Sequence, residues 1–110
     1  MTLPEFYTSI KKALSIPVAY DHFDIDEDDE PLKPPFLSYV DIGKNTFEAD
    51  NVSYITSYAL RVELYTEVKD LSLEETLEKF FEENLINWAD EPTTYIPEEN
   101  LYLHPYNIIF

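Results

Sequence analysis

The chain has 110 residues, of which 45% are hydrophobic and 15% aromatic, so it can bury one core and is expected to form a single domain over residues 1–110. Its 23 acidic and 7 basic residues give a net charge of −16, which opposes specific binding to the phosphates of DNA or RNA. It contains no cysteine, which excludes disulfides, thiolate nucleophiles and zinc sites that use cysteine.

The first predicted element is an amphipathic helix at the N-terminus. Thr2 can cap this helix, and Pro4 falls in its first turn. Pro17 ends the helix near Leu14, and residues 18–23 then predict a short strand. Apolar residues recur at helical spacing along one side: Leu3, Phe6, Tyr7, Ile10, Ala13 and Leu14.

Residues 24–35, DIDEDDEPLKPP, predict an acidic loop, because their charges and prolines prevent regular pairing. Asp29 replaces the glycine that a calcium-binding loop requires, and Pro35 stands where its bidentate glutamate belongs. We therefore predict no metal site here, although three aspartates match the first ligand positions of such a loop: Asp24, Asp26 and Asp28.

Residues 36–41 predict the next strand, and Gly43 predicts a turn after it, since glycine tolerates a positive φ. The short segment 46–52 then fits the tip of a long hairpin.

The strongest strand signal is the alternation over residues 58–65. Its mainly apolar side consists of Tyr58, Leu60, Val62 and Leu64. The other side mixes apolar and charged residues, which indicates contact with solvent or with another subunit. Three residues of that side are the predicted subunit interface: Arg61, Glu63 and Tyr65.

A second helix is predicted from Ser72, which forms a capping box with Glu75. Its buried stripe consists of Leu73, Leu77, Phe80, Phe81 and Leu85. The rest of its surface is densely acidic: Glu74, Glu75, Glu78, Glu82 and Glu83.

Two more strands complete the expected order α-β-β-β-α-β-β. Residues 86–89 predict a short strand, and residues 99–110 a longer one in which Pro105 indicates an edge or bulge position. One side of the last strand carries Tyr102, His104, Tyr106, Ile108 and Phe110. The order predicts an α+β fold, an antiparallel sheet with two helices packed on one face.

Catalytic chemistry is not indicated. His22 and His104 are the only histidines, and no Gly-x-Ser-x-Gly turn offers a nucleophile. With one glycine in the chain, phosphate-binding loops are excluded, so we predict no catalytic residue, no cofactor and no enzyme activity. The chain also lacks a signal peptide and an apolar run near the ~20 residues that cross a bilayer, which predicts a soluble protein made in the cytoplasm with no membrane partner.

Six segments carry a resemblance to a known family and keep its order along nearly the whole chain. The most similar is VELYTEVKD, residues 62–70, followed by the glutamate-rich helix. The others are LPEFY (3–7), PVAYDHF (17–23), PFLSY (35–39), FEADN (47–51) and YIPEENLY (95–102). In these segments the chain resembles the tail terminator, or tail completion, proteins of long-tailed phages and prophages of Gram-positive bacteria.

The resemblance implies a structural virion protein at the top of the tail. Such subunits form a ring, usually a hexamer, that stops growth of the tail tube and joins it to the head connector. The resemblance also implies self-association, contacts with tail-tube and head-connector proteins, and a ring through which DNA passes without specific binding.

Two alternatives remain open from the residues alone. One is a domain that binds an unknown small ligand. The other is an acidic DNA mimic that binds a basic DNA-handling enzyme through carboxylates such as Glu74, Glu78 and Glu82.

Overall fold

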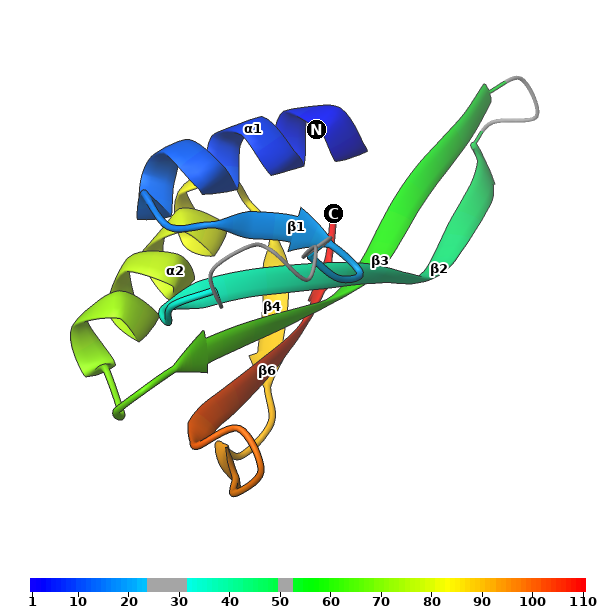
Figure 1. The fold of residues 1–110 in the computed structure, drawn as a ribbon. Coiled ribbons are helices and arrows are strands. Elements are labelled where there is room, and N and C mark those ends of the chain that lie inside the picture. Colours follow the sequence, from blue (N-terminus) through cyan, green and yellow to red (C-terminus); the bar gives the residue numbers. More distant parts are fainter. Residues whose placement is uncertain (24–31, 50–52) are drawn as a thin grey trace.

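The structure is a computed structural model that describes residues 1–23, 32–49 and 53–110, with the backbone alone for residues 44–49 and 53–56. Two helices lie on one face of a six-stranded sheet, which confirms the predicted α+β fold (Figure 1). The elements are α1 (Leu3–Leu14), β1 (Val18–Tyr20), β2 (Phe36–Ala49), β3 (Ser53–Thr66), α2 (Leu71–Glu83), β4 (Asn87–Asp90), β5 (Thr94–Ile96) and β6 (Leu101–Ile109). The short strand β5 was not predicted.

The sheet has the order β1-β2-β3-β6-β4, and β5 also pairs with β6. All pairs are antiparallel except β1 with β2, so the prediction of a wholly antiparallel sheet is wrong at this edge. The connection between these two strands, residues 21–35, is long enough for the crossover that a parallel pair needs. The strand predicted over 18–23 ends at Tyr20, because Asp21 takes a left-handed φ of 66°. Most of the predicted acidic loop, 24–31, lies outside the described residues.

Strands β2 and β3 form one long hairpin that pairs from Phe36 with Tyr65 to Ala49 with Ser53. The predicted turn at Gly43 is wrong, since this glycine lies within β2 at a register shift, and its φ is not positive. Among the described strands, the outer part of the hairpin, residues 45–49 and 53–57, pairs only with itself. We call this part the arm. Figure 1 shows it extending beyond the rest of the sheet.

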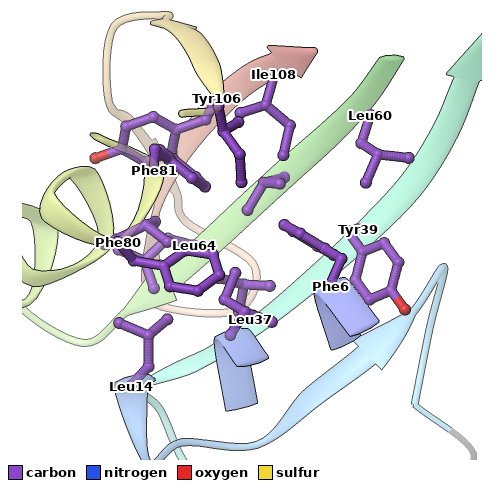
Figure 2. Packing of buried hydrophobic residues seen from close by; sticks show 14 of the residues in the cluster. Phe6, Leu14, Leu37, Tyr39, Leu60, Leu64, Phe80, Phe81, Tyr106 and Ile108 are labelled. Atoms are coloured by element: carbon purple, nitrogen blue, oxygen red, sulfur yellow. The ribbon is translucent and has the colours of Figure 1, made fainter. Parts of the chain in front are cut away.

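The core lies between the helices and one face of the sheet (Figure 2). Phe6 from α1 is fully buried and contacts Tyr39 edge to face, with ring centroids 5.3 Å apart. Phe81 from α2 packs in the same way on Tyr106 of β6, at 5.6 Å. The sheet contributes the predicted side of β3, together with residues of its neighbours: Leu37, Tyr39, Leu60, Val62, Leu64, Tyr106 and Ile108. The prediction of the inward face of β3 is therefore confirmed.

The ends of both helices follow from local capping. Thr2 caps α1 as predicted, because its side chain accepts a hydrogen bond from the Glu5 backbone N–H at 3.3 Å. The cap predicted for α2 is wrong: Asp70, and not Ser72, accepts from the Leu73 N–H at 3.0 Å, so the helix starts two residues earlier than predicted. Leu85, predicted to be buried, follows the helix end with a φ of 57° and is 90% exposed. Its neighbour Ile86 enters the core instead.

The position predicted for the last strand is also wrong, because β6 lies inside the sheet and not at its edge. Pairing with β4 ends at Tyr106, and pairing with β5 begins at Leu103. Pro105 lies in this gap, where its carbonyl accepts from the Glu91 backbone N–H at 3.0 Å. Proline has no backbone N–H to donate, and at position 105 neither β4 nor β5 pairs with β6 and needs a donor.

Candidate functional site

The three predicted interface residues come together on the face of the sheet that the helices leave uncovered, which we call the outer face. Arg61 Nε donates to Glu63 Oε1 at 3.1 Å. The Tyr65 hydroxyl donates to the other oxygen of Glu63 at 2.5 Å, and the Tyr65 ring stacks on Phe36 with centroids 4.9 Å apart. Burial, and then the hydrogen bond to Glu63, raise the pKa of Tyr65, so its hydroxyl stays a donor through the physiological range.

Two residues that the sequence did not single out complete this network. Arg61 Nη1 donates to Glu91 Oε2 at 2.5 Å, and Asn107 Nδ2 donates to the same oxygen at 3.1 Å. These hydrogen bonds, that from Asn107 first, lower the pKa of Glu91. Desolvation lowers the pKa of Arg61, but its hydrogen bonds to Glu63 and Glu91 outweigh this effect and raise it. Arg61 therefore pairs with both carboxylates of this network, Glu63 and Glu91.

An apolar groove of about 290 Å³ adjoins this network. Asn107 and Ala59 border it beside Arg61, and Ile42 and Ile109 are 55% and 46% exposed at its sides. Its lining residues come from four neighbouring strands: Ile42, Ala59, Asn87, Trp88, Ala89, Asn107, Ile108 and Ile109. Exposed branched apolar side chains beside paired charges are typical of a surface that another protein covers.

His104, predicted to lie on one side of the last strand and to have no catalytic role, lies in a buried polar cluster on the helix side of the sheet. Its side chain is 8% exposed. Its Nδ1 lies 2.7 Å from Glu74 Oε1, and its Nε2 lies 2.9 Å from Asp90 Oδ2. The Lys69 ammonium donates to the same Glu74 oxygen at 3.0 Å and to Thr93 at 2.9 Å. Glu74, predicted to lie on an exposed acidic face, is therefore buried because it carries two ionic partners.

Tyr106 closes the other side of this cluster. Its ring stacks on His104 with centroids 4.4 Å apart, and its hydroxyl donates to Glu78 at 2.7 Å. Burial, and then the hydrogen bond to Glu78, raise the pKa of Tyr106. A polar cleft of about 410 Å³ opens above the cluster, lined by Lys69, Glu74, Glu78, Asp90, Glu91, Pro92, Thr93 and His104.

The geometry of the two histidines favours ionic roles. Both ring nitrogens of His104 lie against carboxylates, and Nδ1 also lies 3.4 Å from the Tyr106 hydroxyl, which itself donates to Glu78. His22 lies on the surface, with Nδ1 2.9 Å from Asp21 Oδ2. Within residues 1–23, 32–49 and 53–110, no group of three or more His, Asp or Glu is arranged to hold a metal ion. The aspartates of the calcium-like pattern lie outside these ranges.

Comparisons with known proteins add no relative. No known protein family matches the chain, and a search of curated proteins returns no match. Among the described residues, neither helix has the length and apolar character needed to span a membrane.

Proposed function

We propose that this chain is the subunit of a symmetric ring in the virion of a long-tailed phage, a tail terminator that caps the tail tube and joins it to the head connector. The sequence resemblance described above is what supports assigning this ring to a phage tail. The structural observation that supports self-association is the outer face, where the Arg61 network lies beside the apolar groove.

The outer face is suited to burial by a second subunit. Charges that enter an interface unpaired are costly, whereas Arg61 already has both Glu63 and Glu91 as partners within its own chain. The groove beside them supplies apolar area whose removal from water favours association. A partner therefore gains apolar contact beside a guanidinium that is already paired, although the two carboxylates still leave one negative charge for it to accommodate.

The arm supports assembly by a second argument. A two-stranded hairpin is marginally stable in water on its own, and the arm pairs only with itself among the described strands. Its outer edges leave backbone donors and acceptors available to another chain. In a ring, two different surfaces of one subunit meet those of its neighbours, and the arm and the outer face are two such surfaces.

The net charge of −16 fits a ring that DNA crosses. A lining of like charge repels phosphates, so DNA passes without binding to it. In this proposal the protein is made in the host cytoplasm and ends at the top of the tail, in contact with tail-tube and head-connector proteins.

The alternative of an acidic DNA mimic is less well supported by the geometry. It requires a row of available carboxylates on α2, formed by Glu74, Glu78 and Glu82. Glu74 is bound to His104 and Lys69, and Glu78 accepts from Tyr106. Of the three, only Glu82 has no side-chain hydrogen bond or ion pair among the contacts described above.

The proposal can be tested by adding the purified protein to polymerising tail-tube protein from the same phage or prophage. Electron microscopy should show ring-shaped caps at tube ends and tubes that stop growing. Tubes that elongate without caps would count against the terminator. A protein that stays monomeric in gel filtration and co-elutes with a DNA-handling enzyme would favour the mimic.

A further inference from the structure

Two consecutive residues, Asp90 and Glu91, are held from opposite faces of the sheet. Asp90 reaches the helix side and contacts His104 Nε2 at 2.9 Å. Glu91 reaches the outer face and accepts from Arg61 and Asn107. This pair of residues is therefore a direct covalent connection between the buried cluster and the proposed interface.

The contacts of His104 depend on its protonation. A neutral imidazole has one N–H, whereas the imidazolium has two and can donate to both carboxylates at once. Three charged or titratable groups contact the ring directly: Glu74 of α2, Asp90 of β4 and Tyr106 of β6. Two more lie one contact further away, since Lys69 is bound to Glu74 and Glu78 to Tyr106.

Loss of one ring proton should affect these two carboxylates unequally. The side chain of Glu74 is 9% exposed, so water cannot readily replace the imidazole there, and loss of that hydrogen bond would leave Lys69 alone on this buried carboxylate oxygen. The side chain of Asp90 is 50% exposed and can be hydrated. The neutral ring should keep its N–H on Glu74 and turn a lone pair toward Asp90, which then moves into water.

We propose that His104 is a pH-dependent lock on the Asp90–Glu91 segment, and that its imidazolium form holds Glu91 in place to position Arg61 on the outer face. The effect of this lock on ring formation rests on the function proposed above. Lower pH favours the locked interface and higher pH releases it.

The lock can be tested on the monomer by NMR between about pH 5.5 and 8, the range in which histidines ordinarily change charge. The Arg61 Nε–H signal should follow the titration curve of the His104 ring. The Glu91 amide donates to Pro105, so its hydrogen exchange, corrected for intrinsic pH dependence, should rise about tenfold on deprotonation. Signals at Glu91 and Arg61 that do not follow His104 would overturn the inference.

Three variants sharpen this test. His22→Gln removes the only other histidine and should leave the response unchanged, whereas His104→Gln should abolish it. Where His104→Gln does not fold, Asp90→Asn serves instead: His104 should still titrate while Glu91 no longer responds. A response that persists in Asp90→Asn would refute the connection through Asp90.

Sedimentation at pH 6 and 8, at constant salt, separates this inference from the proposed function. The wild type and His22→Gln should assemble more strongly at pH 6, and Asp90→Asn should lose most of that difference. If Glu91 follows His104 but assembly is equal at both pH values, the lock stands and the proposed interface fails. If Glu91 does not follow His104, the lock fails whatever the assembly does.

Discussion

The ring of Phe6 in the first helix stacks on that of Phe110, the last residue of the chain, with centroids 5.3 Å apart and planes 17° from parallel. Backbone hydrogen bonds in both directions hold Phe110 against Tyr58, at 2.7 and 3.0 Å. The C-terminal residue thus joins α1 to β3 at the base of the arm.

Replacing Phe6 by alanine should lower the free energy of unfolding by ~3–5 kcal/mol, because the side chain is fully buried and contacts three aromatic rings. Urea denaturation followed by the fluorescence of Trp88 measures the loss. Leu85→Ala is the matched control, since Leu85 is 90% exposed and its truncation should cost under ~0.5 kcal/mol. Equal losses in the two variants would contradict the packing described for α1.

Leu64→Ala tests the inward face of β3 separately. Leu64 is 1% exposed and lies in the core between the helices and the sheet, so its truncation should cost ~2–5 kcal/mol. The same denaturation experiment applies. A loss under ~1 kcal/mol would mean that Leu64 faces outward, and the outer face would then have to be reassigned.

The features that the sequence predicted correctly depend on periodicity within one element. Alternation along β3 placed Leu64 inside and Arg61 outside, and helical spacing placed Phe6 and Phe81 in the core. Arg61, Glu63 and Tyr65 share one side of one strand, so their mutual contact follows from spacing alone, and their role as a subunit interface stays a prediction.

The features that the sequence missed depend on pairing between distant segments. Glu91 completes the Arg61 network from 30 residues away, and Glu74 is buried because the fold brings His104 to it. Neither carboxylate differs locally from the many other acidic residues in the chain. Pro105 was misplaced for the same reason, since the gap between β4 and β5 exists only in the assembled sheet.

The raised pKa values of Tyr65 and Tyr106 predict a loss of stability in alkali. A buried tyrosine with a raised pKa stays protonated in the folded state, whereas in the unfolded chain it ionises near pH 10. Its contribution is complete below that pH and is lost as the pH rises further. At about pH 10.5, tyrosinate absorbance should therefore be lower in the native protein than in urea. The double variant Tyr65→Phe/Tyr106→Phe should reduce this difference in absorbance between the native and the unfolded protein. An unchanged difference would show that it comes from other tyrosines.

The last prediction concerns assembly and the charge that opposes it. Each subunit carries −16, so a closed ring gathers a large negative charge, and this repulsion is weakened by salt. We expect a monomer or weak oligomer in dilute low-salt solution and larger species as salt or protein concentration rises. Sedimentation across a salt series measures this directly. A wild type that dissociates further with added salt would show that ionic contacts, and not apolar ones, hold the assembly.

Arg61→Gln then tests which surface is used in that assembly. Because Glu63 and Glu91 flank Arg61, glutamine avoids the three-carboxylate cluster that a charge reversal would create. Lys79→Gln is the matched control: it makes the same change, from −16 to −17, on α2, where Lys79 is 74% exposed. Both variants should fold, but Arg61→Gln alone should leave Glu63 and Glu91 without their shared cation and weaken assembly at every salt concentration. Equal assembly of the two variants would show that subunits meet elsewhere, because only one of the two substitutions alters the outer face.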